Sequence, residues 1–244
     1  MNYRLGAIAA AIAVLGAAPG PDPTERLVYE VVAVKRHLFR LAPGSEERLE
    51  AGARALSGES LRTGSRSSAD LEVPNREARF HIGTKTRFRL APGTPGVLVD
   101  VERGSLRAIF GTLPAGDQRE RLVTTPSAVL AVRGTEYGVE VEKDGDTSVV
   151  VFEGTVEIRD RSGIGEAVRV EAGQSTRIPK GRAPNPPKAH TLTTENWDRG
   201  RRIGQPGWTG QEQPPGQSGA PGQPGGSGSN PPQPRKGGSA RHGG

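Results

Sequence analysis

The sequence has no cysteine and only four histidines, at positions 37, 81, 190 and 242. The absence of cysteine excludes disulfides, thiolate metal sites and cysteine nucleophiles, and it also removes the signal from which a redox compartment is usually inferred. Zinc sites are built from clustered cysteine and histidine ligands, and no two of these histidines are close together in the sequence. We therefore expect no metal site and no cofactor.

Apolar residues are also scarce, at 33% of 244 residues, which is low for a globular protein. Residues 179–244 are rich in glycine, proline and glutamine and hold nine basic and three acidic residues, so the whole net charge of +6 belongs to them. The remaining body is neutral, which argues against nucleic-acid binding because phosphate contacts need a basic face. We expect a disordered basic tail that either attaches weakly to anionic envelope polymers or lipid headgroups, or only increases solubility.

Residues 1–20 resemble a targeting segment. One arginine precedes an apolar run from residue 5 to residue 18, which is shorter than the ~20 residues that a membrane-spanning helix needs. Its length and its small residues at the end are typical of a secretory signal peptide. Because Pro19 follows the expected cleavage point after Ala18, an uncleaved membrane tether is the alternative. Either way, the sequence predicts export to the periplasm or cell envelope.

Residues 24–178 read as a succession of short strands with period-two alternation and many β-branched residues. The segment 46–56 is a short helix at best, since Gly52 interrupts it, and Asp144-Gly145 predicts a hairpin with a type I′ turn. The expected fold is all-β, either a β-roll or solenoid-like stack or a sandwich of short strands. The predicted strands are 28–34, 69–73, 78–82, 86–90, 97–101, 106–110, 122–124, 129–132, 137–141, 148–152, 155–158, 167–170 and 175–178.

A weak repeat marks three places where a strand ends in an apolar residue, then Glu, then Gly. These places end at Gly104, Gly154 and Gly173. Glycine adopts the left-handed conformation that a tight reversal requires, so we expect the chain to reverse at each of them. Their spacing is unequal, which argues against a strict solenoid.

Residues 125–139, TPSAVLAVRGTEYGV, resemble the signature of the FecR domain, TPxAxxAVRGTxF/Y. Later elements of that family, an E-G reversal and an A-G-Q before the last strand, are similar to residues 153–154 and 172–174, and the resemblance covers roughly residues 49–178. The matching positions are Thr125, Pro126, Val132, Arg133, Gly134, Thr135, Tyr137, Glu153, Gly154, Gly173 and Gln174.

The resemblance implies the periplasmic part of an iron-dicitrate-type regulator, in which a cytoplasmic helical domain holds a sigma factor. Only four residues precede the apolar run here. We therefore expect an exported stand-alone form without the cytoplasmic anti-sigma domain and without direct sigma-factor contact. The implied partner is an envelope protein, or an anionic or carbohydrate polymer, of unknown identity.

The motif reads mainly as structure. Proline at 126 restricts Thr125 to an extended conformation, and Arg133-Gly134-Thr135 is expected to form a corner that the hydroxyl of Thr135 holds. Arg133 is expected to pair with Glu136 or Glu153, with a role in binding as the alternative.

No catalytic motif occurs, so no catalytic residue is predicted. His37 and His81 read as half-exposed strand residues. The carboxylate pairs Glu140/Glu142 and Asp100/Glu102 read as cross-strand ion pairs rather than as a glycosidase pair. A calcium site near Asp144 and Asp146 is less expected than a hairpin.

The chain's only tryptophans, Trp197 and Trp208, both fall in the predicted tail and are candidate contacts for a partner. Glycine recurs at nearly every third position from residue 204 to 228, which is collagen-like but too short for a confident triple helix. The leading hypothesis is an exported, non-catalytic FecR-like domain for envelope signal sensing, regulation or scaffolding. A surface-attachment protein acting through its tail and a carbohydrate-active enzyme are the alternatives.

Overall fold

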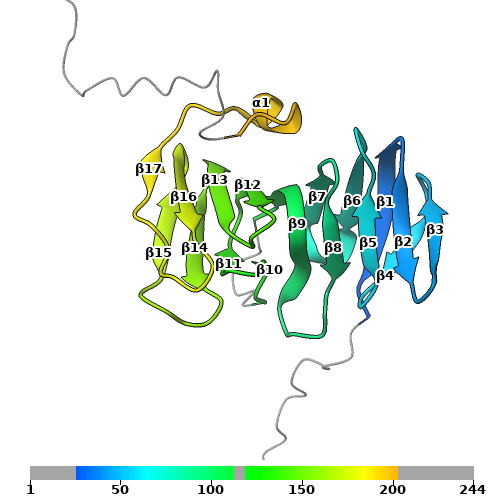
Figure 1. Cartoon of the computed structure of the whole chain (residues 1–244), viewed down its shortest axis with the longest axis horizontal. Helices are drawn as coiled ribbons and strands as arrows, with labels where there is room; N and C mark the ends of the chain where they lie inside the picture. Colours follow the sequence, from blue (N-terminus) through cyan, green and yellow to red (C-terminus); the bar gives the residue numbers. More distant parts are fainter. Residues whose placement is uncertain (1–25, 113–118, 203–244) are drawn as a thin grey trace, which may run out of the picture. The chain divides into compact units, whose positions relative to one another are not determined.

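The computed structural model describes residues 26–112 and 119–202, and this part of the chain is almost entirely β-structure (Figure 1). Its helical elements are the short 3₁₀ helix η1 (Pro74–Arg76) and the single-turn helix α1 (Thr194–Asp198). Among the described residues no helix has the length and apolar character needed to cross a membrane. Trp208 and the glycine-repeat segment lie outside the described residues.

The strands form two sheets that share the long strand β9. Sheet A contains, in spatial order, β4 (Arg54–Leu56), β1 (Val28–Lys35), β6 (Ser68–Val73), β7 (Ala78–Ile82), the second half of β9 (Val97–Phe110), β12 (Glu136–Val141), β13 (Thr147–Glu153), β16 (Gln174–Ile178) and β17 (Lys188–Ala189). Sheet B contains β3 (Ser45–Leu49), β2 (Leu38–Ala42), β5 (Ser60–Thr63), β8 (Arg87–Leu90), the first half of β9, β10 (Leu122–Thr124), β11 (Ala128–Val132), β14 (Thr155–Asp160) and β15 (Val168–Glu171). Every pairing is antiparallel except that of β10 with β9.

One apolar core lies between the two sheets. Alternate side chains point inward, as in β6, where Ala69, Leu71 and Val73 are buried and the residues between them are partly exposed. Phe80 of sheet A and Phe88 of sheet B are both fully buried in this core. The period-two pattern of the sequence is therefore the pattern of inward and outward side chains. The all-β fold predicted from the sequence is confirmed.

The chain passes from one sheet to the other at glycine corners, which we call crossings. Residues 97–103 of β9 pair within sheet B, and residues 104–110 pair within sheet A. At Gly104 φ is +95°, and a Cβ there would lie 2.5 Å from the Cα of Thr86. Gly154 joins β13 to β14 and Gly173 joins β15 to β16, each time between the two sheets. All three glycines thus mark crossings, but the reversal predicted at Gly104 is wrong, because β9 bends there and continues as one strand.

Two local predictions differ from the structure. The segment 46–56 forms strands β3 and β4 rather than a helix, because Gly52 turns the chain with φ of +88° and Leu49 and Ala55 both enter the core. Residues 142–146 do form a hairpin turn. Gly145 has φ of +92° but Asp144 lacks a positive φ, so the turn is not type I′.

Residues 179–202 differ from the disordered tail predicted there. Lys188 pairs with Ser175 as β17 joins sheet A, and α1 lies on the outer face of the same sheet. The indole of Trp197 packs against Val150 and Leu192, and no side chain fits at Gly138, where a Cβ would lie 2.5 Å from the Trp197 ring. Trp197 is buried by its own chain, which gives it a structural role instead of exposing it to a partner.

Candidate binding surface

The beginning of the family motif is a buried cluster of hydroxyl groups. The Oγ1 atoms of Thr125 and Thr147 are 2.8 Å apart, and Oγ of Ser127 donates to Thr147 Oγ1 at 2.7 Å. The amide of Ala128 donates to Thr125 Oγ1 at 2.9 Å, which fixes the chain as it enters β11 after Pro126. These side chains are buried, so their role is to hold the corner.

The second part of the motif is the crossing from β11 to β12. Gly134 has φ of +59°, and its carbonyl approaches Gly154 so closely that a Cβ on Gly154 would lie 2.6 Å from it. The carbonyl of Thr135 accepts from the amide of Phe110 at 2.9 Å. The hydroxyl of Thr135 is buried without a hydrogen-bond partner among the described residues. The expected role of this hydroxyl is therefore wrong, because the backbone holds the corner.

The apolar and aromatic motif positions belong to the core. Val132 and Tyr137 are buried, and the Tyr137 ring stacks on Phe110 with centroids 6.1 Å apart. Burial raises the pKa of the Tyr137 phenol far above its usual range, so the ring stays neutral. Close by, the buried guanidinium of Arg121 donates to the carbonyl of Gly111 at 2.8 Å.

The later motif elements close the other crossings. Ala172 donates its amide to the Gly154 carbonyl at 3.0 Å, and Gly173 donates to Val151 at 2.9 Å. The Oε1 atom of Gln174 accepts from the amide of Glu171 at 3.0 Å, so this side chain ties the turn that begins β16. Glu153 is exposed and makes no ion pair among the residues that the structure describes.

Arg133 is the exception within the motif. Its side chain is exposed, and within the described ranges it makes no hydrogen bond or ion pair. Glu136, one of its expected partners, instead lies 2.5 Å from Nη1 of Arg107. The predicted ion pair of Arg133 is therefore absent, which favours the alternative that Arg133 has a role in binding.

Arg133 borders a hollow of about 400 Å³ on the outer face of sheet B, which we call the arginine groove. Ala131 pairs with Leu122 on one side and with Glu157 on the other, and Glu157 pairs with Arg169, so the floor crosses four neighbouring strands. Five arginines and two glutamates line it, and the arginines Arg133, Arg159 and Arg169 are exposed. The lining residues are Arg119, Glu120, Arg121, Leu122, Ala131, Val132, Arg133, Thr155, Glu157, Arg159 and Arg169.

The arginines of this groove differ in their surroundings. Arg121 is buried and structural, whereas Arg159 and Arg169 are exposed on β14 and β15. Arg159 lies 3.9 Å from Glu157, a solvent-exposed contact that contributes little. A small apolar floor edged by exposed guanidinium groups suits an anionic chain, since arginine binds carboxylates in bidentate geometry.

The carboxylates considered for catalysis all form ion pairs with arginines. Glu140 Oε2 lies 3.1 Å from Arg202 Nε, Glu142 Oε1 lies 2.9 Å from Arg177 Nη1, Asp100 Oδ1 lies 3.1 Å from Arg161 Nη1, and Glu102 Oε2 lies 2.8 Å from Arg87 Nε. Each carboxylate is therefore held by a cation rather than placed opposite a second free carboxylate, as a glycosidase pair requires. Within the described ranges, no group of three or more potential metal ligands is assembled.

The histidines give the same result. In the strand pairing, His81 Nδ1 lies 2.7 Å from Asp70 Oδ1, on the outer face of sheet A. His37 is exposed at a crossing and stacks on Phe39, with ring centroids 5.9 Å apart. Among the described residues, neither histidine makes a hydrogen bond to a serine or threonine hydroxyl that it could activate.

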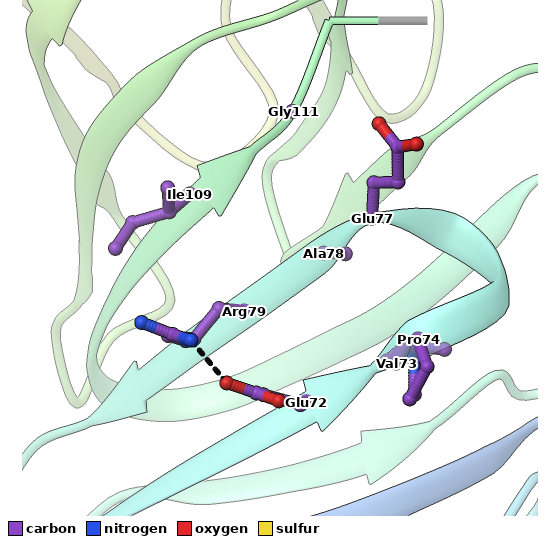
Figure 2. Close-up of a pocket in the computed structure, with 8 residues that line it drawn as sticks. All are labelled: Glu72, Val73, Pro74, Glu77, Ala78, Arg79, Ile109 and Gly111. Carbon is purple, nitrogen blue, oxygen red and sulfur yellow. Dashed lines mark ion pairs between the residues drawn. The ribbon is translucent and has the colours of Figure 1, made fainter.

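Figure 2 shows a second hollow, of about 270 Å³, beside the turn from β6 to β7. Glu72 and Arg79 form an ion pair across it, and the Glu77 side chain lies toward Gly111. A Cβ on Gly111 would be 2.8 Å from Glu77 Oε2. Of the two carboxylates in the lining, Glu72 is held by Arg79, and no histidine or hydroxyl side chain lines this hollow.

The fold and the groove define a class: a two-sheet, all-β domain whose crossings are fixed by glycines and whose exposed motif arginine borders a basic surface. Residues 59–157 match the family model described as FecR protein, which confirms the predicted resemblance over this part of the chain. The match lies inside the range expected from the sequence and ends before Gly173 and Gln174.

Among solved structures, the chain is similar to two crystal structures described as a "putative anti-sigma factor" from Parabacteroides distasonis ATCC 8503. The first has 16% identity and a TM-score of 0.44, covering 54% of this chain and 59% of that one. The second has 16% identity and a TM-score of 0.47, covering 58% of this chain and 65% of that one. This chain thus spans less than two thirds of either. No curated protein matches the sequence.

Proposed function

We propose that this chain is an exported, non-catalytic sensing module that regulates through contact with an envelope protein at the arginine groove. The supporting family evidence is the FecR domain at residues 59–157. Export is supported by the signal-like segment at residues 1–20. The partner would present an extended acidic segment, because the exposed side chains of Arg133, Arg159 and Arg169 border the groove.

The observation that carries this proposal is the contrast between Arg133 and the rest of its motif. Thr125, Val132 and Tyr137 are buried, and each has a structural role. Arg133 is exposed, and nothing in the described fold uses its guanidinium group. A motif side chain that does not stabilise the fold is best explained by a contact outside the chain.

The proposal is tested by crosslinking in intact cells of the native host. A photo-crosslinking amino acid at Ala131, on the groove floor, is expected to give a defined adduct with one envelope protein. The same amino acid at Arg48, exposed on β3, is the matched control and should give none. Arg133→Glu should abolish the adduct because it reverses the charge beside the crosslinker. Equal labelling at both positions, or an adduct that survives Arg133→Glu, would refute the proposal.

A further inference from the structure

A second set of cations lies at one end of the sandwich. Some belong to the connections β1–β2, β5–β6 and β7–β8, and the others to the bend of β9 and the hairpin between β12 and β13. Every one of these cations is exposed. We call this set the basic rim. Its residues are Lys35, Arg36, Arg66, Lys85, Arg103 and Lys143.

The basic rim is a line rather than a scattered group. Strands β1, β6, β7, β9 and β12 are consecutive neighbours in sheet A, so their ends are about 4.8 Å apart. Hydrogen bonds join the crossings in the same order. Gly64 donates to the His37 carbonyl at 3.2 Å, Lys85 donates to the Gly64 carbonyl at 3.0 Å, and Gly83 donates to the Ser105 carbonyl at 2.8 Å. The cations therefore follow one another about one strand apart.

The positive charges of the basic rim are not neutralised within the described part of the chain. None of the six side chains makes an ion pair or a side-chain hydrogen bond there. Elsewhere arginines are paired, as Arg40 is with Glu59 at 2.8 Å. The nearby Glu142 and Asp146 are both engaged by Arg177. Asp144, beside Lys143, is the one exposed acid of the hairpin turn.

The backbone at the rim is strained in a way that its side chains do not explain. Arg36, Arg66 and Lys85 have φ of +67°, +54° and +53°. A residue with a Cβ loses about 1–2 kcal/mol in this conformation, and glycine would avoid the loss. Charged side chains held at such positions point to a use outside the fold.

The chemistry next to the rim favours a sugar polymer. Beside Lys85, Arg103 and Lys143 lies a hollow of about 680 Å³ whose lining includes the hydroxyl groups of Ser65 and Thr84. Three carboxylates also line it: Glu140 and Glu142 are paired with Arg202 and Arg177, and Asp144 is exposed. Hydroxyls suit sugar hydrogen bonding. The lining of this hollow has no aromatic platform on which the bases of a single strand would stack, and no large apolar group that would insert into a membrane.

We propose that the basic rim binds a linear acidic polysaccharide that lies across the strands and places successive carboxylates against Arg66, Lys85 and Arg103. The hollow then receives sugar rings beside Lys143. This site is separate from the arginine groove and goes beyond the function proposed for it. The attraction is electrostatic, so binding weakens as salt is added.

The test uses the full chain and polygalacturonate as the probe, with calorimetric titration at several salt concentrations. In the rim variant Arg66→Gly, Lys85→Gly and Arg103→Gln are combined. Glycine suits the positive φ at the first two positions, so the charge is lost without harm to folding. We expect roughly tenfold or greater loss of affinity. The slope of log Kd against the logarithm of the salt concentration should decrease by about one for each cation removed.

Two variants control for the other cations. Arg133→Gln, Arg159→Gln and Arg169→Gln together remove the same charge from the arginine groove and should leave polymer affinity nearly unchanged. Arg235→Gln, Lys236→Gln and Arg241→Gln measure the contribution of the basic tail. A loss for either control as large as that for the rim variant would overturn the proposal.

Three further probes test the class of ligand. Neutral dextran should not bind. Single-stranded DNA and phosphatidylglycerol vesicles should bind more weakly than polygalacturonate and should be insensitive to the rim substitutions. Tighter binding of either, lost in the rim variant, would overturn the polysaccharide assignment. Crosslinking at Ala131 does not depend on any of these results, so the two proposals fail separately.

Discussion

Replacing Gly154 with alanine should destabilise the fold far more than the same change at Gly173, although both glycines occupy crossings with nearly the same backbone. Their φ values are +75° and +78°, so the left-handed conformation costs alanine about 1–2 kcal/mol at either site. At Gly154 the new Cβ also meets the Gly134 carbonyl at 2.6 Å, whereas nothing lies within 4 Å at Gly173. Overpacking of this kind adds about 1–3 kcal/mol.

We therefore expect Gly154→Ala to lose about 2–5 kcal/mol and Gly173→Ala about 1–2 kcal/mol of unfolding free energy. Urea unfolding of the full-length variants, followed by far-ultraviolet circular dichroism, measures both values, and an unchanged m-value confirms that the native state is comparable. Equal losses at the two sites would show that the close approach of the two crossings does not constrain the fold.

Three further predictions concern α1 and the motif. Gly138→Ala should displace α1, because the new Cβ would lie 2.5 Å from the Trp197 ring. Tryptophan emission should then shift to the red, whereas the control Ser148→Ala on the neighbouring strand should leave the emission unchanged. Burial lowers the pKa of His190, so the unfolded chain binds the proton more readily than the folded chain. The free energy of unfolding should therefore fall as the pH drops through about 6.5 towards that lowered pKa. Urea titrations at several pH values measure this dependence, and His190→Gln should flatten it. Thr147→Val removes the hydroxyl that accepts from buried Ser127 Oγ, whereas Thr125 Oγ1 keeps its bond from the amide of Ala128. The change should cost about 1–3 kcal/mol in urea unfolding, and no loss would show that Ser127 finds another partner.

The central and C-terminal strands could be predicted because their sequence alternates strongly. In β13 and β14, valine and isoleucine recur at inward positions, and the Glu-Gly pair between them marks the crossing. The N-terminal strands β2 to β5 were missed for the opposite reason. Strand β3 buries only Leu49 and has charged residues at the other positions, because it is an edge of sheet B with one neighbour. Edge strands are often charged, which hides them from a pattern search.

The helix α1 was missed because its surroundings are rich in proline and glycine. A local signal was present: Thr193 accepts from the amide of Asn196 at 3.3 Å, as an N-cap does. The packing of Trp197 on Gly138 could not be inferred, since nothing in the sequence shows that a glycine in a strand leaves room for an indole 59 positions further along.

The basic rim shows why a candidate surface can escape prediction from a sequence whose fold can be predicted. Arg36, Arg66, Lys85 and Arg103 are separated by 18 to 30 positions, and each reads as an ordinary solvated charge in a turn. Their alignment depends on the order of β1, β6, β7 and β9 in sheet A, which follows from the crossings. A neutral body can thus carry a continuous line of positive charge, because net charge describes how many charges there are and the topology decides which of them are neighbours.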